Sequence, residues 1–147
     1  MKMLRILIVE DETLIALVLE GMIADIVPAT VVIEASVAST MKILNDTIDF
    51  AFLDIDVTNG KTFEIAKILD RKHVPFVFVS GSRQADLPFE LHSAPFIAKP
   101  FVPAQIESAL QAVANYSRLH PFSKLEKLEK LEKTNLKFSE HWPHAGN

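Results

Sequence analysis

The chain has 147 residues, of which 49% are hydrophobic, and its formal net charge is −4. This is enough apolar material for one compact domain, and the lack of a basic excess argues against a nucleic-acid partner. There is no cysteine, no apolar run long enough to span a membrane and no convincing signal peptide, so we expect a cytoplasmic protein without disulfides, thiolate metal sites or a membrane partner.

Short apolar runs rich in β-branched residues and phenylalanine predict five buried strands. They are residues 4–9, 30–35, 49–54, 74–79 and 95–98. Segments with apolar positions at helical spacing predict helices between and after them. These are residues 12–26, 36–45, 61–71 and the segment that begins at Pro103. Between the last two strands, residues 81–94 contain Pro88, which predicts only a short or irregular element.

The alternation of strand and helix along the chain is typical of an α/β fold with a doubly wound, five-stranded parallel sheet. Continuous apolar strands indicate that helices cover both faces of this sheet. In such folds, ligands bind beside the carboxyl ends of the strands, where the strand order switches. We therefore expect the functional side chains directly after the strands.

The predicted domain covers residues 1–118, and residues 119–147 form a separate charged segment and flexible tail. Within that segment, residues 124–133 repeat Lys-Leu-Glu with a period of three, which predicts a solvated helix with a broad leucine stripe and not a coiled-coil seam. A partner-binding or dimerising helix is the alternative interpretation.

Polar side chains follow four of the predicted strands. Glu10 and Asp11 follow the first, Asp54 ends the third, Ser80 follows the fourth and Lys99 follows the fifth. Each alone has a simpler explanation as a turn or cap residue, but parallel strands would bring all of them to one edge. Clustered carboxylates need a cation, and an all-oxygen ligand set suits Mg²⁺. A carboxylate beside Mg²⁺ and a lysine is suited to accept phosphate.

The stretch around Asp54 alone supports two chemistries. The pattern Asp54-x-Asp56-x-Thr58 occurs in phosphatases with an aspartate nucleophile, where Asp56 would be the general acid and base. A single aspartate at a strand end is also how a signalling receiver accepts phosphate.

The constellation as a whole resembles the receiver domain of two-component response regulators (the CheY-like superfamily). The matching stretches, within a resemblance that covers about residues 3–118, are residues 8–12, 53–54, 79–81 and 99–101. The resemblance implies a flavodoxin-like sheet with strand order 2-1-3-4-5. It also implies a single-domain regulator that accepts a phosphoryl group from a histidine kinase or phosphotransfer protein and signals through another protein.

The resemblance assigns roles to individual residues. Asp54 would be the phosphoacceptor, Asp11 would bind Mg²⁺ directly, and Glu10 would bind it mostly through water. The backbone carbonyl of Asp56 would be a further metal ligand. Ser80 would hydrogen-bond the phosphoryl group after its arrival.

Lys99 would pair with a phosphoryl oxygen, and the Lys99–Pro100 peptide would be cis. Phe96 takes the aromatic switch position but has no hydroxyl group. The loop after the acceptor is short, with Gly60 six residues on and no proline, as in short-loop receivers that often stand alone. The resemblance implies a phosphoacceptor with self-phosphorylation and autodephosphorylation, not a turnover enzyme. Its downstream partner, and dimerisation through residues 95–118 or the leucine repeat, stay open.

Two alternatives remain. A haloacid-dehalogenase-type phosphatase needs a further acidic pair at a strand end after the lysine, but the acids after Lys99 lie in apparent helices or in the tail. Its first aspartate motif also normally lies on the first strand, where Glu10 and Asp11 stand. A degenerate receiver that binds partners independently of phosphate is the other alternative, and the intact constellation argues against it.

Overall fold

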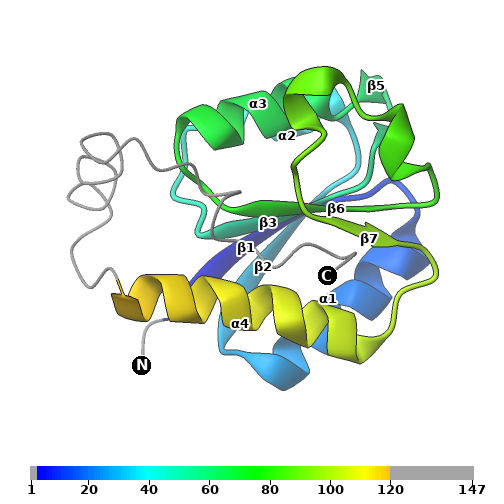
Figure 1. Cartoon of the computed structure of the whole chain (residues 1–147). Coiled ribbons are helices and arrows are strands. Elements are labelled where there is room, and N and C mark those ends of the chain that lie inside the picture. Colours follow the sequence, from blue (N-terminus) through cyan, green and yellow to red (C-terminus); the bar gives the residue numbers. More distant parts are fainter. Residues whose placement is uncertain (1–2, 120–147) are drawn as a thin grey trace.

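The computed structural model describes residues 3–119, which form a five-stranded parallel sheet between two layers of helices (Figure 1). The strands are β1 (Leu4–Val9), β2 (Ala29–Glu34), β3 (Phe50–Leu53), β6 (Phe76–Ser80) and β7 (Phe96–Ala98). Their order across the sheet is β2-β1-β3-β6-β7, and every neighbouring pair is parallel. Because β6 and β7 are the fourth and fifth strands of this sheet along the chain, the predicted order 2-1-3-4-5 is confirmed.

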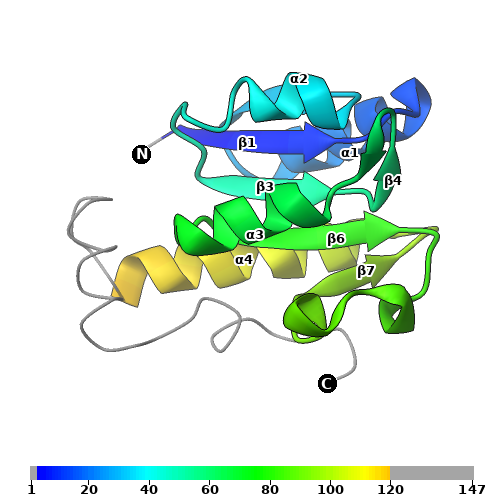
Figure 2. The same ribbon diagram turned by 90° about the horizontal axis from the view of Figure 1, so that it is seen from above.

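Helices cover both faces of the sheet, as the two perpendicular views show (Figures 1 and 2). One face carries α1 (Thr13–Ile26) and α4 (Pro103–Leu119), and the other carries α2 (Val37–Met41) and α3 (Phe63–Arg71). Successive strand residues point to opposite faces, so each strand feeds both cores. The core under α1 and α4 receives Ile6, Ile8, Phe50, Phe52, Val77 and Val79. The core under α2 and α3 receives Leu7, Val9, Ala51, Leu53, Phe76 and Phe78.

The burial of both faces explains the unbroken apolar strands. A Phe or Ile that is fully buried contributes about 1.5–3 kcal/mol relative to an exposed one. A polar residue inside β3 or β6 would lose this contribution and would need a buried partner. The polar residues that matter for chemistry therefore stand where the strands end.

The second predicted helix is shorter than expected. It was predicted over residues 36–45, whereas α2 ends at Met41 and turns follow to residue 45. The backbone tightens there, since Ile43 N donates to Thr40 O and Asp46 N donates to Ile43 O, both three residues back. These tighter turns allow Leu44 to enter the core, and the Asn45-Asp46 pair favours turns over helix.

The segment between β6 and β7 is irregular, as predicted from Pro88. It contains two single-turn 3-10 helices, η1 (Gln84–Asp86) and η2 (Phe89–Leu91). Pro88 lies between them, and the segment is anchored by apolar side chains in the core under α2 and α3. These are Leu87, Leu91 and Ala94.

A small hairpin was missing from the prediction. β4 (Asp56–Val57) pairs antiparallel with β5 (Gly60–Lys61) directly after the end of β3. The turn has Asn59 at φ 73° and Gly60 at φ 130°, a backbone region that Asn tolerates and Gly adopts freely. The Asn-Gly pair was the available signal, but each strand has only two residues, too few for any periodicity.

Along residues 3–119, no helix is both long and apolar enough to cross a bilayer. The predicted Leu-Glu-Lys repeat helix (residues 124–133) and the rest of the predicted tail beyond Leu119 lie outside the described residues.

Candidate functional site

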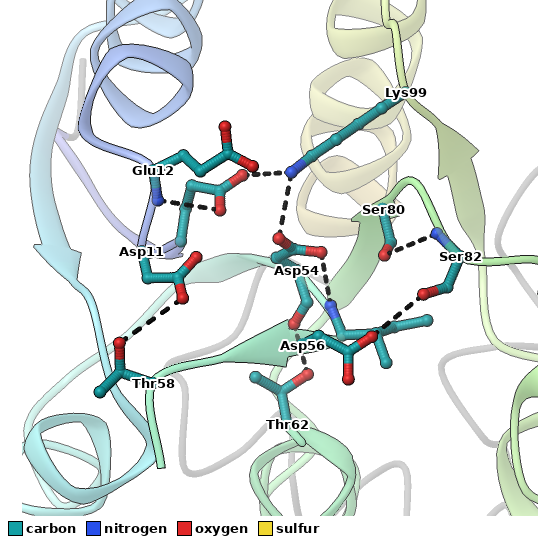
Figure 3. A network of polar contacts seen from close by, with 11 residues as sticks. Asp11, Glu12, Asp54, Asp56, Thr58, Thr62, Ser80, Ser82 and Lys99 are labelled. Carbon is teal, nitrogen blue, oxygen red and sulfur yellow. Dashed lines mark hydrogen bonds and ion pairs between the residues drawn. The ribbon is translucent and has the colours of Figure 1, made fainter. Parts of the chain in front are cut away.

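The predicted site residues meet at the carboxyl edge of the sheet. Glu10 and Asp11 follow β1, Asp54 follows β3, Ser80 ends β6 and Lys99 follows β7. Figure 3 shows Asp11, Asp54 and Lys99 facing one another across this edge, with Ser80 beside them. Carboxylate oxygens of Glu10, Asp11 and Asp54 all lie within 4.8 Å of one another. The parallel sheet thus gathers residues that are up to 89 positions apart in the chain.

Lys99 bridges two of the three carboxylates. Its Nζ lies 3.0 Å from Asp54 Oδ2 and also contacts Glu10 Oε1. Burial opposes the charged ammonium, but its hydrogen bonds to Glu10 and Asp54 outweigh this and raise the pKa of Lys99. Lys99 is therefore a fixed positive charge next to the predicted acceptor.

Glu10 is the most buried of the acids, with 4% of its surface exposed. The pKa of Glu10 is raised from 4.5 to about 6, chiefly by burial and also by the neighbouring Asp54, while the contact with Lys99 acts to lower it. Its Oε2 also accepts a hydrogen bond from Glu12 N at 3.3 Å. The negative charge of this cluster is thus only partly compensated by Lys99.

Asp54 is held on both sides of its carboxylate. Ile55 N donates to its Oδ1 at 2.8 Å, while Lys99 contacts Oδ2. Its backbone is also fixed, since Asp54 N donates to Val9 O at 2.9 Å and Thr62 Oγ1 donates to Asp54 O at 2.5 Å. With 9% of its surface exposed, Asp54 presents a carboxylate in a fixed orientation at the edge of the sheet, and its role as phosphoacceptor stays a prediction.

Asp11 is exposed and completes the all-oxygen group. Thr58 Oγ1 lies 3.5 Å from Asp11 Oδ2, at the limit of a hydrogen bond. Oxygen-only carboxylate ligands at this spacing match the chemistry that Mg²⁺ prefers. The structure therefore brings together the three predicted carboxylate ligands, and the ligand role of the Asp56 carbonyl stays a prediction.

The side chain of Asp56 has other partners. Its Oδ1 forms an ion pair with Lys61, and its Oδ2 accepts a hydrogen bond from Ser82 Oγ at 3.2 Å. The hydrogen bond from Lys61 lowers the pKa of Asp56. The side chain of Asp56 is therefore paired with Lys61 and Ser82 and not with the carboxylate of Asp54.

Ser80 and Phe96 flank the site without touching the acceptor carboxylate. Ser80 is buried, and its Oγ accepts a hydrogen bond from Ser82 N at 3.2 Å. Phe96, with 5% of its surface exposed, packs in the core under α2 and α3. The predicted cis Lys99–Pro100 peptide is present. The phosphoryl-binding role of Ser80 and the switch role of Phe96 stay predictions.

Solved structures share this fold and supply the family. The response regulatory domain of protein mrkE from Klebsiella pneumoniae superposes with a TM-score of 0.69 and 26% identity over 79% of this chain and 99% of its own. SdrG from Sphingomonas melonis Fr1 superposes with a TM-score of 0.63 and 34% sequence identity, over 78% of this chain and 99% of its own. The non-phosphorylated HemR receiver domain from Leptospira biflexa superposes with a TM-score of 0.61 and 27% sequence identity, over 75% of this chain and 93% of its own. The chain belongs to the receiver family of response regulators.

A curated relative agrees with this assignment to the receiver family. The sensory transduction protein LytR of Staphylococcus haemolyticus (strain JCSC1435) is 32% identical over 115 residues. The match covers 75% of this chain, and the chain spans 45% of the length of that relative. No protein-family model matches the chain. The predicted function as a receiver in two-component signalling is confirmed, and neither the phosphatase nor the phosphate-independent module gains support.

Three residues of this receiver site were not found from the sequence. Thr62, Ser82 and Lys61 carry no distinguishing signal in the sequence, because threonine and serine are common at caps and turns and lysine is common on surfaces. The hydroxyl of Thr62 makes no cap hydrogen bond to the start of α3 but donates to the main-chain carbonyl of Asp54. Their roles depend on the hairpin of β4 and β5, which folds residues 61 and 62 back onto residues 54–56.

Proposed function

We propose that Asp54 accepts a phosphoryl group from the phosphohistidine of a histidine kinase or phosphotransfer protein, and that the receiver then signals by changing its protein partner. The observation that carries this proposal is the half-buried Lys99 ammonium on Asp54 Oδ2, with the exposed carboxylate of Asp11 beside it. In the transfer, the phosphorus–nitrogen bond breaks as an Asp54 oxygen bonds to phosphorus. The imidazole takes up a proton, and Asp54 becomes an acyl phosphate.

The charges around Asp54 define what the transfer needs. Three carboxylates face one ammonium, and an incoming phosphoryl group adds negative charge. Bound through Glu10, Asp11, Asp54 and the Asp56 carbonyl, Mg²⁺ would neutralise charge on the phosphoryl oxygens. Lys99 supplies the second positive charge, and Ser80 lies at the next strand end to donate a hydrogen bond to the product.

The surface beside the acceptor suits a helical protein donor. The first turns of α1 expose Leu14, Leu17 and Val18 by 79%, 51% and 53%, and this helix begins two residues after Asp11. Leucine and valine at these positions form one apolar stripe along the helix. We assign it to the phosphohistidine-bearing partner, because a donor seated there places its histidine over the carboxyl edge of the sheet.

We propose residues 1–118 as the receiver unit and residues 119–147 as a separate segment. Kinase donors use cytoplasmic ATP, and we propose the same compartment for this receiver.

The test is phosphorylation by acetyl phosphate in the presence of Mg²⁺, followed by intact mass. We expect one base-labile phosphoryl group, which Asp54→Asn abolishes and which the matched variant Asp70→Asn, an exposed position on α3, retains. Labelling of the Asp54→Asn protein would refute the assignment. Repeated turnover of a generic phosphomonoester that depends on Asp56 would favour the phosphatase.

A further inference from the structure

Thr62 is a fully buried polar residue at the start of α3. A buried hydroxyl without a partner is costly, so its contact indicates what the residue does. Thr62 Oγ1 donates to the main-chain carbonyl of Asp54 at 2.5 Å, and Figure 3 shows the two residues one above the other. Although Thr62 stands at the start of α3, its hydroxyl group donates a hydrogen bond to Asp54 and does not cap the helix.

The backbone of Thr62 closes the same segment. Thr62 N donates to Ile55 O at 3.0 Å, and Ala66 N donates to Thr62 O at 2.9 Å as α3 begins. One residue therefore holds residues 54 and 55 through two hydrogen bonds and joins them to a helix. The closed segment, residues 54–62, contains the whole β4–β5 hairpin.

The hydrogen bonds of Thr62 fix the main chain at Asp54, which other contacts also hold. Asp54 N is tied to Val9 O on the β1 side, and Ile55 N holds Asp54 Oδ1. The Thr62 hydroxyl fixes the Asp54–Ile55 peptide from its carbonyl end, and this peptide carries the N–H that orients the carboxylate. Rotation of the peptide would move both this N–H and the following Asp56.

We propose that Thr62 is a positioning residue for phosphoryl transfer: its hydroxyl holds the Asp54–Ile55 peptide so that the Asp54 carboxylate and the Asp56 main chain face the incoming group. This inference rests on the proposed function of Asp54 and assigns it a further residue. Thr62 does not touch the reacting atoms and acts through the backbone of Asp54.

The test compares Thr62→Val, which removes the hydroxyl at nearly constant shape, with Thr62→Ser, which keeps it. Thr40→Val is the matched control, because Thr40 is equally buried and its hydroxyl donates to a main-chain carbonyl, Ser36 O at 2.7 Å, within the α2 turn. All proteins are compared in their folded state by acetyl phosphate labelling rate and by Mg²⁺ titration of the Ile55 amide resonance.

We expect Thr62→Val to slow labelling and weaken Mg²⁺ binding by about tenfold, the scale of one lost hydrogen bond to a buried group. Thr62→Ser should restore both, and Thr40→Val should lose stability with unchanged labelling. Equal labelling rates in Thr62→Val and Thr40→Val would overturn the positioning role while leaving Asp54 as the acceptor. Absent labelling of the wild-type protein would instead refute the proposed function itself.

Discussion

Glu10 provides a test of the charge balance at the site, because its substitution by glutamine has opposite effects without and with Mg²⁺. A pKa of about 6, against an ordinary 4.5, means that holding Glu10 ionised costs the folded protein up to about 2 kcal/mol. Glutamine has the shape of the neutral acid, and its oxygen still accepts a hydrogen bond from Lys99. We therefore expect metal-free Glu10→Gln to be more stable than wild type by about 1–2 kcal/mol at neutral pH.

The pH dependence follows from the sign of the shift. The folded protein holds the Glu10 proton more tightly than the unfolded chain, so between pH 4.5 and about 6 the native state binds more protons. The contribution of Glu10 to stability is then fully present below pH 4.5 and is lost as the pH rises through about 6. Glu10→Gln lacks this loss, so its advantage should disappear on acidification.

The assay is urea unfolding at pH 4.5 and pH 7.5, with a chelator or with excess Mg²⁺. A ligand at one hundred times its Kd stabilises the folded state by about 2.7 kcal/mol. Because Glu10→Gln lacks one of the proposed Mg²⁺ ligands, excess Mg²⁺ should stabilise the wild type more than the variant and make the wild type the more stable of the two. Glu12→Gln, an exposed neighbour, serves as the control and should change little. A Glu10→Gln protein that is less stable than wild type in chelator at pH 7.5 would refute the reasoning.

Four further outcomes are expected. Asp56→Asn loses the ion pair with Lys61 and should change the lifetime of the phosphoaspartate but leave its formation intact, as followed by loss of label; blocked uptake would contradict this. Phe96→Tyr adds a hydroxyl to a buried side chain and should cost about 1–3 kcal/mol in urea unfolding; an unchanged midpoint would mean that the hydroxyl finds a partner. Leu17→Lys should slow transfer from a phosphohistidine donor at unchanged acetyl phosphate labelling, and equal donor rates would exclude the α1 stripe. Removal of residues 121–147 should leave a folded, phosphorylatable domain by circular dichroism and intact mass, and unfolding would place the tail in the core.

The sheet and the polar residues at its edge were predictable because both follow from short-range signals. Unbroken apolar runs specify strands that are buried on both faces, and the carboxyl ends of parallel strands share one edge. Glu10, Asp11, Asp54 and Lys99 were therefore placed together without knowledge of any contact. The irregular segment after β6 followed from Pro88 in the same way.

The contacts that the sequence did not indicate depend on how the chain turns after β3. A hairpin with two residues in each strand has no periodicity to detect, yet it brings Lys61 to Asp56 and Thr62 to Asp54. The early end of α2 likewise depends on the fit of Leu44 into the core, which is a tertiary effect. Contacts between residues five to eight positions apart, such as Lys61 with Asp56 and Thr62 with Asp54, were thus harder to predict than contacts between residues from different strands.

The connection between Ser80 and Lys99 suggests how a local charge change reaches the outer strand. Lys99 N donates to Ser80 O at 3.0 Å, and Ser80 pairs with Ala98 in the β6–β7 register. Both residues proposed to contact the phosphoryl group are therefore joined by one stretch of backbone. A phosphoryl group on Asp54 would attract the Lys99 side chain away from Glu10. The main chain of Lys99 directly follows β7 and is hydrogen-bonded to Ser80, so such a shift would act on this part of the backbone. Because Phe96 is buried at the start of this strand and has no hydroxyl group, its predicted switch role would depend on repacking of the ring and not on an exchange of hydrogen bonds.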